Sequence, residues 1–238
     1  MKNQYFGDIR DLFKYDLIRC IMKEIDTLQR FIFIPMLTKN DSKGREGNKR
    51  NFDRAKAKGR PGTKNKKLMD FLKKYKEVGR DERDFTKIKN YFKSENIKID
   101  IYKGHDKYFN HSTRGKYFEN ISEELLHKSL VFVDPDIGLQ VKNSKEKHLL
   151  YDEVKGLYSR MDKDSILMIY QHFPREVHTE YLRRRANELK ERTKTKDLPK
   201  SISDNEIIFF LLTKNDELKN QLEGIIKRYY PEKTKFSI

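Results

Sequence analysis

The segment that most constrains the fold is a short apolar run, Leu130-Val131-Phe132-Val133, which ends directly in Asp134-Pro135-Asp136. The run is too short for a helix, and Pro135 and Gly138 bound it as turn residues do. Such a run is typical of a strand buried on both faces, and strands of that kind belong mostly to parallel sheets covered by helices. We therefore expect this strand inside an α/β sheet, with two carboxylates at its carboxyl end.

Asp134 and Asp136 occupy a position that often carries chemistry. In open α/β sheets the ligand crevice lies at the carboxyl ends of the strands, and Pro135 fixes the backbone between the two acids. The alternative is an ordinary Asp-Pro turn whose carboxylates face solvent. We take Asp134 and Asp136 as candidate catalytic residues.

Strand-like and helix-like segments alternate along the chain. Strands are expected at 31–37, 97–102, 130–133, 166–170 and 206–212, and helices at 8–28, 67–75, 85–92, 145–161, 175–194 and 215–230. The alternation predicts a mostly parallel, Rossmann-type sheet with right-handed crossovers and helices on both faces. A length of 238 residues fits a single α/β domain, 1–238.

The charge balance favours a partner rich in phosphate. The chain has 53 Lys and Arg against 37 Asp and Glu, a net charge of +16. Basic surfaces attract nucleic acid because each neutralised phosphate releases condensed counterions. A bias in genome composition, the alternative explanation, raises acids and bases together and leaves this excess unexplained. We therefore expect nucleic acid, RNA or DNA, as the partner.

Cysteine content and hydropathy indicate the cellular compartment that we expect for the protein. Cys20 is the single cysteine, which excludes an intrachain disulfide and a cysteine-based zinc site. The first residues carry no apolar run typical of a signal peptide, and no segment approaches the ~18 apolar residues of a membrane span. We expect a cytoplasmic protein with no membrane partner.

Residues 38–67 are expected to form a long, flexible, basic loop inserted into the domain. Residues 43–67 hold eleven Lys and Arg against two acids, a net charge of 11 − 2 = +9. A loop of this length is usually functional or disordered, and we interpret it as a clamp for a phosphate backbone, with a solubilising loop as the alternative. A second basic surface is expected on the helix at 175–194. The candidate nucleic-acid-binding residues are Lys49, Arg50, Arg54, Lys56, Lys58, Arg60, Arg183, Arg184 and Arg185.

The strand expected at 166–170 also ends in polar residues, Gln171 and His172. Neighbouring parallel strands present their carboxyl ends at the same edge of a sheet. We therefore add Gln171 and His172 to the candidate catalytic residues.

A Mg²⁺-dependent nuclease is one function that the acids allow, because carboxylates are hard ligands for Mg²⁺. In that hypothesis Asp134 and Asp136 bind the metal, and Pro135-Asp136 with Glu153-Val154-Lys155 copies the Pro-Asp and Glu-x-Lys elements of PD-(D/E)xK nucleases. Those nucleases carry the Glu and Lys on a strand, whereas the apolar spacing around Val154 predicts a helix.

The run from Gly7 to Tyr15, Gly-Asp-Ile-Arg-Asp-Leu-Phe-Lys-Tyr, resembles the Gly-Asn-x-x-Asp-x-x-Lys-His signature of the RlmJ-type ribosomal RNA adenine methyltransferases. In that family a central strand ends in Asp-Pro-Pro-Tyr and the following strand in a Tyr-Pro segment, which here look like residues 134–137 and 170–174. The likeness spans roughly residues 5–175. The chain also resembles a group of uncharacterised bacterial proteins that share an Asp-Pro-Asp-x-Gly-Leu motif.

The first resemblance implies a class I methyltransferase-like fold and methyl transfer from S-adenosylmethionine to a base in RNA or DNA. It implies that Asp134 accepts a hydrogen bond from the adenine amine. It also implies a cofactor site formed by Gly7, Asp8, Asp11, Lys14 and Tyr15.

The chain differs from this family at two places. No glycine-rich turn follows the strand at 31–37, where the family's backbone approaches the cofactor, and Asp136 and Ile137 replace the family's second Pro and its Tyr. Loss of that aromatic removes base stacking of roughly 1–3 kcal/mol. A third hypothesis is therefore a non-catalytic nucleic-acid-binding protein on a methyltransferase-like scaffold.

Overall fold

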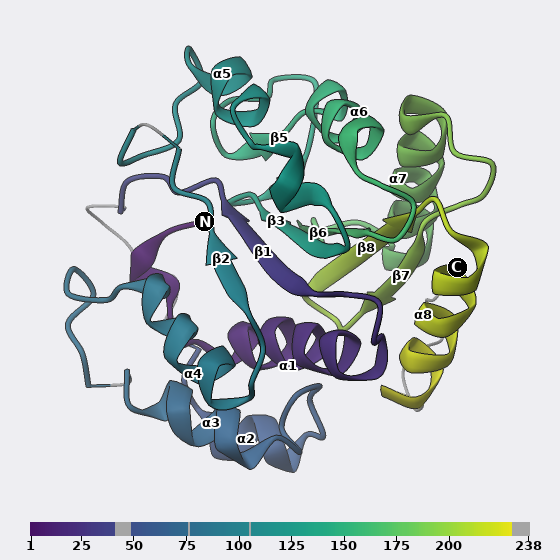
Figure 1. Ribbon diagram of the computed structural model, residues 1–238. Coiled ribbons are helices and arrows are strands. Elements are labelled where there is room, and N and C mark those ends of the chain that lie inside the picture. Colours follow the sequence, from purple (N-terminus) through teal and green to yellow (C-terminus); the bar gives the residue numbers. More distant parts are fainter. Residues whose placement is uncertain (41–48, 76, 105, 230–238) are drawn as a thin grey trace.

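A central sheet has the strand order β2-β1-β3-β6-β8-β7 in the part of the chain that the computed structural model describes, residues 1–40, 49–75, 77–104 and 106–229 (Figure 1). Strands β2, β1, β3 and β6 are parallel, whereas β8 runs antiparallel to both of its neighbours. The strands of this sheet are β1 (Arg30–Pro35), β2 (Ile99–Ile101), β3 (Ser129–Asp134), β6 (Ile166–His172), β7 (Lys200–Ser203) and β8 (Ile207–Thr213). The sequence analysis is thus confirmed at the level of a mostly parallel α/β sheet.

Helices cover both faces of this sheet, and two short strands pair beside it. The described helices are α1 (Ile9–Glu24), α2 (Phe52–Ala57), α3 (Lys66–Lys73), α4 (Ile88–Ser94), α5 (Arg114–Glu119), α6 (Tyr151–Arg160), α7 (His178–Thr193) and α8 (Asp216–Tyr229), with single 3₁₀ turns η1 (Asn3–Tyr5), η2 (Phe85–Lys87) and η3 (Glu123–Leu126). The short strands are β4 (Gly138–Leu139) and β5 (His148–Leu149). Figure 1 shows α1, α3, α4 and α8 on one side of the sheet and α5, α6 and α7 on the other.

Alternate residues of each central strand enter two different hydrophobic cores. In β3, Leu130 and Phe132 face the core of α1, α3, α4 and α8, whereas Val131 and Val133 face the core of α5, α6 and α7. All residues of β3 are buried, as the apolar run predicts for a strand covered on both faces. At about 25 cal/mol per Å² of buried apolar surface, these two cores supply the main driving force for the fold.

The strand order creates a switch point between β1 and β3. From β1 the chain crosses to β2 on one side, and from there it returns to β3 on the other side of β1. At such a point the two crossover connections leave in opposite directions, which opens a crevice at the carboxyl ends of the strands. Pro35 and Asp134 are register partners at this edge.

The structure differs from the sequence-based expectation in three segments. Residues 38–67 are not one flexible loop, because their described part contains α2, whose Phe52 and Ala55 are buried. The helix expected from residue 145 begins only at Tyr151, after β5. Strand β7 was not expected, since Lys200-Ser201-Ile202-Ser203 offers a single large apolar residue, and it is held by pairing with β8.

Local signals in the sequence explain why α1, α2 and α3 begin where they do. Asp8, Asn51 and Asn65 are the N-caps, and each side chain accepts a hydrogen bond from a backbone N–H of the first turn. Cys20 lies partly buried on α1, and burial raises the pKa of its thiol to about 12, so it is an inert core residue. No described helix is long and apolar enough to cross a membrane.

Candidate functional site

Asp134, the last residue of β3, forms a buried ion pair with Lys14 of α1. The Lys14 ammonium lies 2.9 Å from the Asp134 carboxylate and 3.1 Å from that of Asp11. Burial opposes the positive charge, but Asp134 and Asp11 outweigh it and raise the pKa of Lys14 well above its usual value. Lys14 therefore stays charged and links α1 to the carboxyl edge of the sheet.

Asp136 lies in a second group of cations two residues further on. Its carboxylate is 3.3 Å from the Lys2 ammonium, 3.7 Å from the Met1 amino group and 4.0 Å from the Lys147 ammonium. Thr38 donates its hydroxyl to the same carboxylate at 3.4 Å. Both acids of the Asp-Pro-Asp turn are thus neutralised by ammonium groups of the chain itself.

The segment from Gly7 to Asp11 leads into the first turn of α1, and Asp8 and Asp11 both line the same cavity as Asp134. Asp11 accepts a hydrogen bond from the Gly7 backbone N–H at 2.9 Å. Gly7 has φ +86°, and a Cβ there would lie 2.8 Å from that of Tyr75, so only glycine fits. Burial and the neighbouring Asp11 raise the pKa of Asp8 to about 7.

Six of the predicted residues converge on one small cavity of about 40 Å³. A water molecule has a share of about 30 Å³ in the liquid, so this space has room for water but not for a cofactor. Side chains near the start of the chain, among them Lys2, Tyr5 and Phe6, form one wall of the cavity. The six predicted residues that line it are Asp8, Asp11, Lys14, Asp134, Asp136 and His172. We call this space the closed cavity because its small volume admits no cofactor, although it is partly open to solvent.

The structure does not bring Tyr15 and Gln171 into the closed cavity. Tyr15 is fully buried in the core, edge-on to Phe33 and Phe92. The Gln171 side chain lies on the other face of β6, where its oxygen accepts the Leu139 N–H at 2.7 Å. Tyr15 therefore packs in the core and does not reach this cavity, whereas Gln171 lines a larger neighbouring cavity together with His172.

His172 lies at the rim of the closed cavity and is held by Tyr170, whose hydroxyl lies 2.8 Å from the His172 Nε2. Burial and the nearby Arg10 guanidinium lower the pKa of His172 to about 4. A neutral imidazole at neutral pH is the form that can accept a proton, although the closed cavity gives it no substrate.

S-adenosylmethionine does not fit the closed cavity. Ligand sites usually have volumes of about 300–1,000 Å³, and the chain's own ammonium groups already bind the acids that could hold the cofactor's amino group. Asp134 pairs with Lys14, and Asp136 pairs with Lys2. The absence of a glycine-rich turn after β1 agrees with this misfit.

The metal site of the nuclease hypothesis is also not assembled in the described part of the chain. Those residues contain no group of three or more His, Cys, Asp or Glu side chains that could hold a metal ion. Glu153 lies on α6, as expected, and its carboxylate binds the Arg114 guanidinium at 2.5 and 2.8 Å. Lys155 is exposed on the same helix.

An open cavity of about 510 Å³ lies beside the Asp-Pro-Asp turn, between the 137–142 segment, the end of β6 and α7. We call it the carboxyl-edge cavity. Two of its residues, Ile137 and Val141, are exposed apolar side chains, at 40% and 46% of their surface. The other residues that line it are Leu139, Gln140, Lys142, Tyr151, Gln171, His172, Phe173, Pro174, Glu176, Tyr181, Arg184, Arg185, Glu188 and Arg192.

The carboxyl-edge cavity combines aromatic walls with cations. Phe173 stacks on His178 with ring centroids 3.9 Å apart, and the Arg184 guanidinium lies 5.2 Å from the centroid of the Tyr181 ring. Arg184 is paired with Glu176, whereas Lys142 and Arg192 lie within ion-pair distance of no carboxylate in the described residues. Aromatic rings beside cations are the features that bind nucleotides.

Of the predicted nucleic-acid-binding residues on α7, Arg183 and Arg184 are exposed, but Arg185 is buried. The Arg185 guanidinium donates to the Tyr151 hydroxyl at 3.0 Å and to the Gln140 carbonyl at 2.9 Å, and it pairs with Glu188 at 2.6 Å. Arg185 therefore joins α7 to the floor of the carboxyl-edge cavity and lines that cavity from a buried position.

Three cations surround Glu206, in the turn between β7 and β8. Glu206 binds Lys49 at 2.7 Å, Arg10 at 3.1 Å and the Arg60 guanidinium. Although burial opposes its charge, Lys49 and Arg60 lower the pKa of Glu206 to about 2. The Phe173 N–H donates to the Glu206 carbonyl, so this cluster continues to the carboxyl-edge cavity.

The remaining basic residues predicted in the 38–67 range lie on or near α2. Arg54, Lys56 and Lys58 are exposed, whereas Arg50 is partly buried. The sequence analysis did not identify Glu206, which holds two of the predicted cations, nor Phe173 and Tyr181 of the carboxyl-edge cavity. Only the apolar Ile137 in a polar stretch could have indicated an open surface there.

Comparisons with known proteins add no relative. No protein-family model, curated protein or solved structure matches this chain.

Proposed function

We propose that this protein binds single-stranded nucleic acid at the carboxyl edge of its sheet, on a scaffold like that of the class I methyltransferases. One observation carries the proposal: the carboxyl-edge cavity of about 510 Å³ places aromatic and apolar walls next to cations. Its volume is within the range of small-ligand sites, and it can admit an unstacked base. The net charge of +16 supplies the attraction for the phosphate backbone.

The cations around the cavity extend the contact beyond one nucleotide. Lys142, Arg184 and Arg192 border the cavity, and the Glu206 cluster lies directly beside Phe173. The exposed bases of α2 continue the same basic region past Arg60. This arrangement supports a strand that inserts one base and passes its phosphates over the neighbouring cations.

The test is the affinity for a fluorescently labelled oligonucleotide, measured by anisotropy over a range of salt. Log K falls with log salt, and each lost phosphate contact makes this fall shallower by about 0.7 for a single strand, so R184E/R192E should reduce the steepness of the slope by about 1.4. The matched control, K89E/K93E, inverts two exposed charges on α4 and should change the slope little. If the two double variants changed the slope equally, binding would depend on the net charge alone, and the proposed site would be wrong.

A second candidate, methyl transfer to a base, is supported by one observation: six predicted residues line the closed cavity at the switch point. It needs a conformation in which the side chains of Lys2, Tyr5 and Phe6 leave that cavity. Calorimetric titration with S-adenosylmethionine decides between the candidates. Binding heat would favour a methyltransferase, whereas the described closed cavity predicts none.

A further inference from the structure

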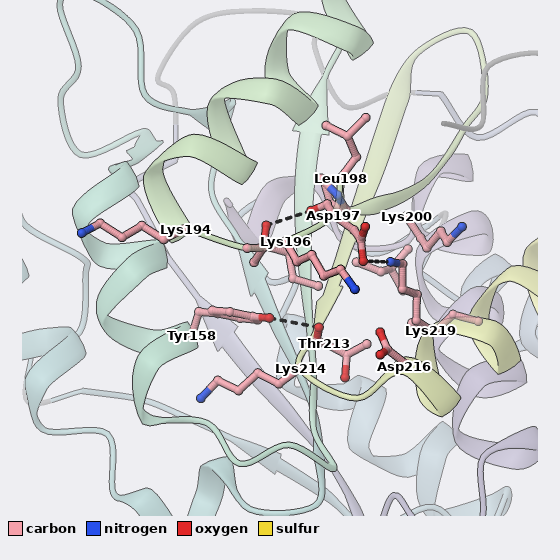
Figure 2. Close-up of a pocket in the computed structure, with 15 residues that line it drawn as sticks. Tyr158, Lys194, Lys196, Asp197, Leu198, Lys200, Thr213, Lys214, Asp216 and Lys219 are labelled. Carbon is pink, nitrogen blue, oxygen red and sulfur yellow. Dashed lines mark hydrogen bonds and ion pairs between the residues drawn. The ribbon is translucent and has the colours of Figure 1, made fainter.

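A second sizeable cavity lies at the opposite, amino edge of the sheet. It has a volume of about 330 Å³ and lies where β8 ends, since Thr213 is the register partner of Ile166 at the start of β6. Figure 2 shows that its labelled side chains come from α6, the 194–200 segment, the end of β8 and α8. We call it the amino-edge cavity.

The amino-edge cavity has an apolar floor and a basic rim. Leu211, Leu212 and Leu222 are buried beneath it, and Leu198 and Pro199 contribute further apolar surface. The rim carries two aspartates, Asp197 and Asp216, and five lysines: Lys194, Lys196, Lys200, Lys214 and Lys219.

Pairing leaves an excess of positive charge at this rim. Lys219 pairs with Asp197, and Lys200 pairs with Glu223. Three lysines and one aspartate of the rim lie within ion-pair distance of no opposite charge among the described residues: Lys194, Lys196, Lys214 and Asp216. Their net charge is 3 − 1 = +2.

The turn that carries two of these lysines is fixed by its own hydrogen bonds. The Thr195 hydroxyl donates to the Asp197 carbonyl at 2.9 Å, and Lys194 ends α7 in the left-handed conformation, with φ +58°. The pair between Asp197 and Lys219 joins the turn to α8 (Figure 2). Thus the backbone that carries Lys194 and Lys196 is held in place while their ammonium groups stay exposed.

Lys214 and Tyr158 define the wall on the α6 side. The Lys214 ammonium donates to the Ser159 carbonyl at 3.0 Å and lies 5.4 Å from the centroid of the Tyr158 ring. The Tyr158 hydroxyl donates to the Thr213 carbonyl at 3.0 Å. Lys214 is bound only to neutral carbonyls, so its charge is still available to attract an anion.

We propose that the amino-edge cavity binds a nucleoside monophosphate. A phosphate monoester carries a charge of about −1.5 to −2 at neutral pH, which matches the excess of positive charge at the rim. The leucine floor and the Tyr158 side can accept the flat face of a base, and the volume suits a molecule of this size. The site is separate from the carboxyl-edge cavity and does not depend on nucleic-acid binding there.

The test is ¹H–¹⁵N NMR of the full chain titrated with AMP, GMP, CMP and UMP. At least one nucleotide should saturate shifts of the backbone amides at 195–198 and 213–216. Adenosine and inorganic phosphate, each of which lacks one half of the ligand, should bind at least ten-fold more weakly than the preferred nucleotide.

Charge-reversal variants test whether Lys194 and Lys196 bind the nucleotide. K194E/K196E should weaken the affinity at least ten-fold, whereas K89E/K93E on α4 should leave it within two-fold. The proposal is overturned if no nucleotide moves the amides at 195–198 and 213–216 at millimolar concentration, or if K194E/K196E binds like the wild type. Shifts confined to 139–142 and 171–176 would place the nucleotide in the carboxyl-edge cavity and equally overturn it.

Discussion

Lys14 and Asp134 form a buried ion pair, 2.9 Å long, that joins the first helix to the end of the central strand β3. The two residues are 120 positions apart in the sequence. Both residues are buried. Their ion pair lies at the switch point, where a Rossmann-type sheet usually binds its ligand. The crevice there is reduced to about 40 Å³ by the protein's own side chains; the carboxyl-edge cavity lies next to it, whereas the amino-edge cavity lies at the opposite edge of the sheet.

Removal of one partner of this pair should strongly destabilise the fold. K14M leaves Asp134 and Asp11 buried without their cation, and we expect a loss of about 3–5 kcal/mol in the free energy of unfolding, measured by urea denaturation. K23M, at an exposed position of the same helix, should change stability by less than about 0.5 kcal/mol. Similar small losses in both variants would show that the pair is not as enclosed as described.

His172 should make the protein acid-sensitive. Its pKa falls from the ordinary 6.5 to about 4 in the folded state, so between these values the unfolded chain binds the extra proton and stability decreases as the pH falls. From pH 7 to pH 4, wild type should lose about 3 kcal/mol more than H172Q. The His172 ring signals in NMR should titrate near pH 4; a midpoint near 6.5 would contradict the burial of this ring.

Gly138 should not tolerate a side chain. It has φ +145°, and a Cβ would overlap the Gln171 amide that binds the Leu139 N–H. G138A should therefore cost about 1–3 kcal/mol, through strain and a lost hydrogen bond. Gly156 on α6 has open space around it, and G156A should instead stabilise the protein by about 0.5–1 kcal/mol. In thermal denaturation, we expect a lower melting temperature for G138A and a higher one for G156A than for the wild type.

Glu206 should restrain nucleic-acid binding, because its single carboxylate binds Arg10, Lys49 and Arg60 and lowers the net positive charge beside the carboxyl-edge cavity by one. In E206Q these cations become available to phosphates. We expect several-fold tighter binding of the labelled oligonucleotide at low salt and a steeper salt dependence. E217Q, an exposed position at the start of α8, is the control. An unchanged affinity in E206Q would show that the cations around Glu206 do not contact the bound strand.

The sheet could be predicted from the sequence because its central strands are continuous apolar runs. The run 130–133 has no alternation, which indicates burial on both faces, and β3 indeed contacts two cores. Strand β7 could not be found this way, because Ser201 and Ser203 have little β propensity and the strand depends on its pairing with β8. Asn51 and Asn65, which cap α2 and α3, lie inside the range 38–67 that the sequence analysis expects to form one loop.

The position of the candidate site could be predicted from the sequence, but the pairing of its acids with lysines could not. The acids at 134 and 136, the residues of the first helix and His172 do meet at one edge, as their places at strand ends and at a helix start indicated. No pattern in the sequence reveals that Lys14 and Lys2 neutralise these acids, since those contacts join residues far apart in the chain. For the same reason the sequence does not indicate that Arg185 is buried: a charged residue is typical of a surface, whereas here Tyr151 and Glu188 bind the guanidinium.

The most direct test of the proposed nucleic-acid site is photo-crosslinking of an oligonucleotide that contains 5-iodouridine, followed by mass spectrometry of the linked peptides. Because iodouridine reacts with aromatic side chains in contact, we expect a cross-link at Phe173, which lines the carboxyl-edge cavity and is only partly buried. Cross-links confined to aromatic residues away from this cavity, such as Tyr108, would contradict the account.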